Sequence, residues 1–136
     1  MAATIDFELV TPEKLVKSEP VEMVVVPGSE GDMGVLPGHS LLVGTVRPGL
    51  LVVYEGGKPV DRLFVAGGMV DISPERCTVL AVEARPLAEF GRAEAEARLA
   101  RAREALGDAE TDAARAVAER RIYVAETLLS LLDRPA

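Results

Sequence analysis

Residues 77–98, CTVLAVEARPLAEFGRAEAEAR, contain the point at which the chain changes from one hydrophobic pattern to another. Before Pro86, short apolar runs alternate with turns, a pattern typical of β-strands. After Pro86, Gly and Pro become rare and Ala, Arg and Glu dominate, which favours α-helix. The sequence therefore predicts two parts: a β domain over residues 1–86 and a helical segment over residues 87–136.

Upstream of the break, apolar runs recur between turns that contain Gly and Pro. Ile5, Phe7 and Leu9 alternate with Asp6 and Glu8, as in a half-buried strand. Short strands separated regularly by such turns are typical of an antiparallel sandwich or barrel. The other apolar runs that we expect to form strands are residues 21–26, 41–46, 50–54, 60–66, 69–72 and 77–82.

Downstream of the break, the sequence predicts two helices, over residues 87–106 and 112–132. We expect Gly107 to end the first helix and Thr111 or Asp112 to cap the second. The short connector makes the pair an antiparallel hairpin, so the fold class is α+β. The first helix has a mostly alanine face, which buries little apolar area, so the hairpin is either a weakly held, mobile element or an ordinary packed helical pair. On the second helix the apolar stripe comprises Ala114, Val117, Val124, Leu128 and Leu131, widened by Ala118, Ile122, Ala125, Leu129 and Leu132.

Composition excludes several classes of function. The 136 residues carry a formal net charge of −7, whereas binding to nucleic acid needs clusters of Lys and Arg. An anionic membrane surface would also repel the chain.

The N-terminus has no signal-peptide pattern, and no apolar run approaches the ~20 residues that span a bilayer. We expect a soluble protein that reaches a membrane only through other subunits. Cys77, the one cysteine, reads as a small core residue.

Several motifs over the whole chain resemble those of the epsilon subunits of bacterial F-type ATP synthases. Their order and spacing match, and the ordered motifs together are more specific than any one alone. The resemblance implies a sandwich of about ten antiparallel strands followed by two helices. The motifs are FELVTPE at 7–13, PGSEGDMGVLPGH at 27–39, VRPGL at 46–50, VAGGMV at 65–70 and CTVLA at 77–81.

The resemblance also implies a function. It predicts a non-catalytic central-stalk subunit without an active site, which holds the gamma subunit against the c-subunit ring for rotary coupling. It further predicts that the hairpin extends into the catalytic alpha/beta head and inhibits ATP hydrolysis. The implied location is the cytoplasmic face of the bacterial inner membrane, as a peripheral protein. The alternative is a generic sandwich-plus-hairpin module that binds an unrelated partner.

The loop region from residue 30 to residue 42 holds the predicted partner contacts. By motif position, the resemblance implies that Glu30 and Asp32 face the c ring. The predicted contacts with gamma are His39, Ser40, Leu41 and Leu42. From the residues alone, a polar turn, a metal site and a hydrolase site based on His39 are alternatives. No second histidine and no nucleophile motif accompany them, so we assign no catalytic and no metal-binding residue.

Arginines on the hairpin are the predicted regulatory contacts. A guanidinium binds a carboxylate through two hydrogen bonds, so Arg115, Arg120 and Arg121 are candidates for pairing with an acidic loop on the catalytic head. Arg121 interrupts the apolar stripe. The alternative is that these arginines lie on a solvent-exposed helix face and form only weak ion pairs within each helix.

Some members of this family bind ATP on the hairpin as a regulatory ligand. Their motif has an aliphatic residue, an acid, two variable positions and then Arg-Ala. Arg92 and Ala93 agree with this motif, whereas Ala88 and Glu89 depart from it. The resemblance thus leaves ATP binding at Glu89 and Arg92 open, and it implies no other cofactor.

Overall fold

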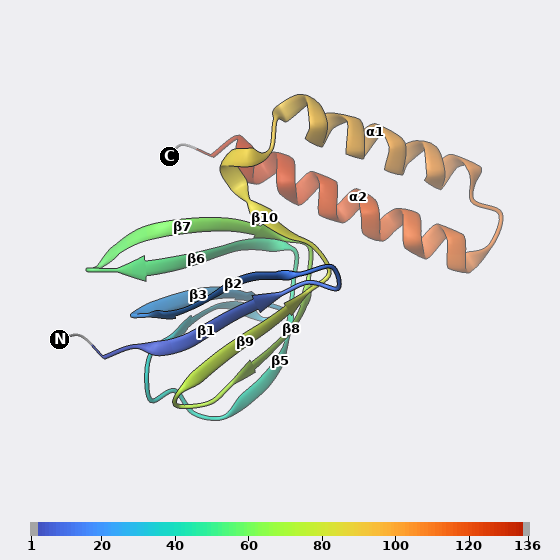
Figure 1. Cartoon of the computed structure of the whole chain (residues 1–136). Coiled ribbons are helices and arrows are strands. Elements are labelled where there is room, and N and C mark those ends of the chain that lie inside the picture. The colour runs from blue at the N-terminus through green and yellow to red at the C-terminus, as the bar shows by residue number, and fades with distance from the viewer. Residues whose placement is uncertain (1–2, 135–136) are drawn as a thin grey trace. The chain divides into compact units, whose positions relative to one another are not determined.

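The computed structural model describes residues 3–134, which form ten β-strands, one 3₁₀ turn and two α-helices (Figure 1). The chain divides into two compact units between Leu87 and Ala88. The first unit contains the strands and the second contains the helices. The predicted α+β class, with a β-sandwich followed by a helical hairpin, is confirmed.

The ten strands form one continuous sheet that folds back on itself around a single core (Figure 1). The strand order is β10-β7-β6-β3-β5-β8-β9-β1-β2, and β4 pairs with β3 beside this path. The strands are β1 Ile5–Val10, β2 Leu15–Val21, β3 Met23–Gly28, β4 Gly31–Val35, β5 Leu42–Val46, β6 Gly49–Glu55, β7 Lys58–Val65, β8 Gly68–Ile72, β9 Arg76–Ala81 and β10 Ala84–Pro86.

The core of the sandwich is aliphatic, with few aromatic side chains. Ile5, Phe7 and Leu9 on β1 are fully buried, as their alternation predicts. β1 and β9 run parallel, unlike the antiparallel pairs around them, and their register sets Phe7 beside Cys77. Among residues 3–134 no polar or charged residue is fully buried, so hydrophobic burial dominates the stability of this core.

Lys17 links two strands that are not neighbours in the pairing order. Its ammonium lies 2.6 Å from Asp61 on β7 and 3.0 Å from Glu19 on its own strand, β2. Partial burial lowers the pKa of Lys17, but the bonds to Asp61 and Glu19 outweigh that effect and raise its pKa above the ordinary value. The contact ties β2, at one end of the sheet, to a strand near the other end.

Gly68 occupies a position at the start of β8 that no other residue can fill. Its φ is +151°, and a Cβ there would lie 2.0 Å from the carbonyl oxygen of Leu80 on β9. The glycine therefore lets β8 and β9 approach closely at the point where they begin to pair.

Three strands were not predicted as separate elements, because their sequences lack a local strand signal. β2 carries Lys17, Ser18, Glu19 and Pro20 in succession, and it pairs with β1 alone, so its proline costs no ladder hydrogen bond in the sheet interior. β4 contains two glycines, and β10 is three residues long. Each is specified by its partner strand rather than by its own pattern.

The second unit contains α1, Arg92–Asp108, and α2, Asp112–Leu132, after a 3₁₀ turn at Leu87–Glu89. The predicted helix over 87–106 is wrong at both ends. Gly91 is extended, with φ −92° and ψ 151°, so α1 begins at Arg92 and not at Leu87. Gly107 lies within α1 and does not end it, because its φ is not positive. For α2 the predicted bounds are confirmed, and Thr111 accepts a hydrogen bond from the Ala114 amide at 3.0 Å.

The helices pack as an antiparallel pair through small side chains (Figure 1). Ala95 and Ala102 are buried on α1, and Ala118 and Ala125 are buried on α2. The predicted stripe is only partly buried, since Val117 near the start of α2 is 51% exposed. Neither described helix is long and apolar enough to cross a membrane.

Candidate functional site

The β3–β4 turn brings Glu30 and Asp32 together but leaves them in different environments. Gly28 pairs with Gly31, so Ser29 and Glu30 form a tight two-residue turn, and both are exposed. Asp32 follows on β4, and its Oδ1 accepts a hydrogen bond of 2.6 Å from Nη2 of Arg47. Glu30 makes no hydrogen bond or ion pair with any residue from 3 to 134. The two predicted contact residues are thus close in sequence but differ in their contacts within the chain.

The predicted gamma-facing segment leads from a loop into β5. The amide of His39 donates to Leu36 at 3.1 Å, and Nδ1 of His39 lies 2.7 Å from the carbonyl oxygen of Ser40. Leu41 is 80% exposed and Leu42 is the first residue of β5. Within the described part of the chain, no three His, Cys, Asp or Glu side chains gather as metal ligands.

Sequence reasoning missed an exposed apolar row on the outer face of the sheet. Met69 on β8 pairs with Leu80 on β9, Leu80 pairs with Val10 on β1, and Val10 pairs with Leu15 on β2. Met69, Leu80 and Leu15 are 51%, 55% and 55% exposed, and Val10 is half-buried. In the sequence, each of these residues is a single apolar position on the solvent-facing side of its own strand. The four form a row only because the strand register places them side by side. We call Val10, Leu15, Met69 and Leu80 the apolar row.

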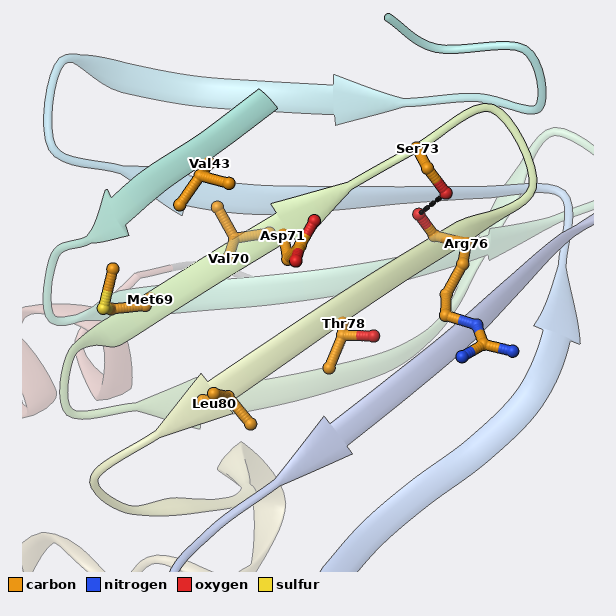
Figure 2. Close-up of a pocket in the computed structure, with 8 residues that line it drawn as sticks. All are labelled: Val43, Met69, Val70, Asp71, Ser73, Arg76, Thr78 and Leu80. Atoms are coloured by element: carbon orange, nitrogen blue, oxygen red, sulfur yellow. Dashed lines mark hydrogen bonds between the residues drawn. The ribbon is translucent and has the colours of Figure 1, made fainter. Parts of the chain in front are cut away.

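The same outer face forms a groove across β5, β8 and β9, in which Met69 and Leu80 of the row lie together with apolar and polar side chains (Figure 2). Val43 pairs with Asp71, and Asp71 pairs with Thr78. The amide of Gly38 donates to the Pro74 carbonyl at 2.8 Å, which ties the segment before β5 to the β8–β9 turn. The predicted gamma-facing segment and the apolar row therefore border one face.

The three predicted regulatory arginines lie on α2 and differ in their contacts. Arg115 pairs with Asp112 at 3.3 Å, and the Arg120 guanidinium lies 5.8 Å from the centre of the Tyr123 ring. Arg121 is exposed, lines a groove at the connector end of the hairpin, and makes no ion pair or hydrogen bond with the described residues. Of the three arginines, Arg121 can therefore bind a partner without first breaking a contact with a described residue.

At the other end of the hairpin, Arg92 is held by carboxylates. Its Nε donates to Glu96 at 2.8 Å, and its Nη1 donates to Asp133, just after α2. Glu89 lies in the 3₁₀ turn before α1. A phosphate that binds Arg92 would have to displace the carboxylates of Glu96 and Asp133.

Cys77 is a core residue, as predicted. Its side chain is fully buried, and burial, with a smaller effect of Asp71, raises the pKa of the thiol to about 12. The thiol stays protonated at neutral pH, which excludes it as a nucleophile in the folded chain.

The sandwich carries exposed apolar and charged surfaces, and the helical pair carries an exposed arginine. These features are those of a protein that acts by binding other proteins. Residues 4–86 match the family model of the beta-sandwich domain of the ATP synthase delta/epsilon chain. The ATP synthase epsilon chain of Rhodospirillum rubrum is 50% identical over 130 residues, which cover 96% of this chain and 97% of that one. The epsilon chain of Paramagnetospirillum magneticum is 50% identical over 94% of this chain and 96% of its own length.

Solved structures agree. A chain in the Euglena gracilis mitochondrial ATP synthase structure of OSCP, F1 and c-ring is 32% identical, has a TM-score of 0.79, and matches over 97% of this chain and 83% of that chain. A chain in the central stalk and c-ring structure of the Tetrahymena thermophila enzyme has a TM-score of 0.64 over 96% of this chain and 97% of that chain, and at 16% identity it shows the fold alone. The chain therefore belongs to the ATP synthase epsilon chain family. It is an accessory subunit of ATP synthase rather than a catalytic one, which removes the alternatives of an unrelated binding module and a hydrolase.

Proposed function

We propose that the sandwich holds the gamma subunit against the c-subunit ring, and that the hairpin slows ATP hydrolysis by reaching the catalytic alpha/beta head. The location we propose is the cytoplasmic face of the bacterial inner membrane, where the chain is held by the complex. The observation that carries the proposal is the apolar row, because a surface of aligned, exposed aliphatic side chains gains free energy when a partner covers it.

The outer face of β5, β8, β9, β1 and β2 is the proposed gamma-binding surface. It combines the apolar row with a groove whose lining adds polar side chains such as Asp71, Arg76 and Thr78, and the segment from His39 to Leu42 borders it. An apolar centre with a polar rim is the usual composition of a stable protein interface. Leu41, which is 80% exposed, adds apolar area at the border.

The β3–β4 turn is the proposed contact with the c ring. It offers the carboxylates of Glu30 and Asp32 near polar loops of the ring, in keeping with the motif at residues 27–39. The hairpin arginines Arg115, Arg120 and Arg121 are the proposed contacts with the head. Arg121 is the strongest of these candidates because its guanidinium has no hydrogen bond or ion pair with residues 3–134.

The gamma-binding surface is tested by placing a charge in the apolar row. Leu80→Glu would bury an unpaired carboxylate against gamma, so we expect at least about a tenfold loss of affinity for gamma. Val60 is also exposed, at 52%, but lies on β7 outside the row, so Val60→Glu is the matched control. Both variants are expressed in the whole synthase, and the amount of gamma that co-purifies with each is measured. Equal recovery of gamma with Leu80→Glu and Val60→Glu would contradict the proposal.

A further inference from the structure

We infer that Arg47 is a positioning residue that fixes the β3–β4 turn, so that Glu30 alone meets the partner while Asp32 serves as the anchor for Arg47. The inference rests on the proposed function, in which this turn contacts the c ring. It assigns partner contact to Glu30 and the anchoring of the turn to Asp32. It also gives a positioning role to Arg47, for which the sequence predicts none.

Arg47 contacts both strands of the β3–β4 hairpin. Its Nη1 donates to the carbonyl oxygen of Gly28 at 2.7 Å, and its Nη2 donates to Asp32 Oδ1 at 2.6 Å. Gly28 ends β3 and Asp32 lies near the start of β4. The Arg47 amide also donates to the carbonyl oxygen of Pro27 at 2.8 Å. One planar guanidinium therefore bridges the base of the turn, a geometry that a lysine ammonium reproduces poorly.

The backbone of the turn is held from a second direction. The Ser29 amide donates to the carbonyl oxygen of Thr45 at 2.9 Å, so the turn is bonded to the segment that carries Arg47. Gly31 has a φ of +135°, a conformation that side chains resist, which lets the chain reverse within two residues. These bonds leave the exposed Glu30 at the tip of a turn whose base is fixed.

The charges of the turn are not equivalent. The Asp32 carboxylate is paired with a cation, and the Arg47 side chain is only 35% exposed, whereas Glu30 is exposed and has no partner among the described residues. The Asp32 side chain is itself 60% exposed, but its charge is paired with Arg47, so the unpaired negative charge presented to a partner is that of Glu30. It suits a group that donates hydrogen bonds or carries positive charge, such as a Lys, an Arg or a polar loop amide.

The experiment compares five variants in the complete synthase and as the full-length chain: Arg47→Ala, Arg47→Lys, Asp32→Asn, Glu30→Gln and Arg62→Ala. Arg47→Ala removes the guanidinium of the ion pair between Arg47 and Asp32, and Asp32→Asn removes the negative charge that the guanidinium binds. Glu30→Gln removes the charge at the tip without touching the base, and Arg62→Ala removes an exposed arginine on β7 as a control. The readouts are hydrogen exchange of the backbone amides in residues 28–32 of the chain, and proton-driven ATP synthesis by the complex.

We expect Arg47→Ala and Asp32→Asn to speed exchange in residues 28–32 by about tenfold or more, since each removes one charge of the charge-assisted bond between Arg47 and Asp32. Both should also lower ATP synthesis. Glu30→Gln should lower ATP synthesis with exchange unchanged, and Arg62→Ala should change neither. Arg47→Lys should restore part of the synthesis lost in Arg47→Ala.

Two outcomes would overturn the inference: unchanged exchange in both Arg47→Ala and Asp32→Asn, or faster exchange with full ATP synthesis while Glu30→Gln is impaired. A different outcome concerns the proposed function. If Glu30→Gln and Arg47→Ala both leave synthesis intact although exchange is faster in Arg47→Ala, the turn is fixed by Arg47 but is not the contact with the c ring. Because Asp32→Asn removes the ionic part of the contact without altering Arg47, the result does not depend on the folding of one variant.

Discussion

Arg92, the first residue of α1, forms an ion pair with Asp133, the residue that follows α2. The pair joins residues 41 apart in sequence and closes the open end of the helical hairpin. Glu96 accepts a second hydrogen bond from the same guanidinium. Arg92 therefore holds the two helices together at the end opposite their connector, which is a different role from the nucleotide contact that the motif implied.

The first prediction concerns ATP. A phosphate that binds Arg92 must displace Asp133 and Glu96, and both carboxylates repel it. Asp133→Asn should therefore tighten ATP binding to the full-length chain by up to about fivefold, the equivalent of one exposed ion pair. Arg92→Ala should abolish binding. Calorimetric titration of the three proteins measures the difference, and the lack of any ATP response in wild type and Asp133→Asn would exclude ATP as a ligand here.

The second prediction concerns the proposed brake. Deleting residues 87–136 should raise ATP hydrolysis by the assembled enzyme, because the hairpin can no longer reach the catalytic head. Arg121→Ala should give part of this rise, since the Arg121 guanidinium makes no ion pair with the part of the chain that the structure describes and can therefore meet a partner. Arg101→Ala on α1, also an exposed arginine, is the control and should leave hydrolysis unchanged. Hydrolysis that is equally slow without the hairpin would show that the brake hypothesis is wrong.

The third prediction is a dependence of stability on alkaline pH through Cys77. Burial raises the pKa of the thiol from 9.0 to about 12 in the folded chain, so the unfolded chain loses its proton first as pH rises. Stability is therefore fully present below about pH 8.5, and by pH 10 it should have fallen by about 1.5–2 kcal/mol. Urea unfolding at pH 8 and pH 10 measures the change.

Cys77→Ala separates this effect from the titration of other groups. The variant should be less stable at pH 8, because it loses buried contacts, but its decline up to pH 10 should be smaller by the same about 1.5–2 kcal/mol. Parallel declines in the two proteins would contradict the role given to the thiol.

The fourth prediction compares two glycines. Gly68→Ala forces a Cβ to within 2.0 Å of the Leu80 carbonyl oxygen at a φ of +151°, so it should cost about 2–4 kcal/mol of unfolding free energy. Gly107→Ala should instead stabilise the chain, by up to about 1 kcal/mol, because Gly107 lies inside α1 and a Cβ there meets open space. Thermal unfolding decides between these signs. A loss of stability in Gly107→Ala would mean that α1 ends before that residue, as the sequence alone suggested.

The sequence alone determined those elements whose signal is local. The alternation of Ile5, Phe7 and Leu9 predicts a strand with one buried face, and all three side chains lie in the core. The cap at Thr111 and the extent of α2 also follow from nearby residues, because a cap bonds to an amide within the next turn. The change of pattern near Pro86 separates strands from helices for the same reason.

Only the tertiary structure decided the surfaces and the long-range contacts. Strand register aligns Val10, Leu15, Met69 and Leu80 in one row, and register depends on pairing between distant segments. The position of Gly107 shows the same limit on a smaller scale, since a glycine that often ends a helix lies inside one here. The ion pairs of Arg47 with Asp32 and of Arg92 with Asp133 join side chains 15 and 41 residues apart, and no spacing rule links such positions before the chain has folded.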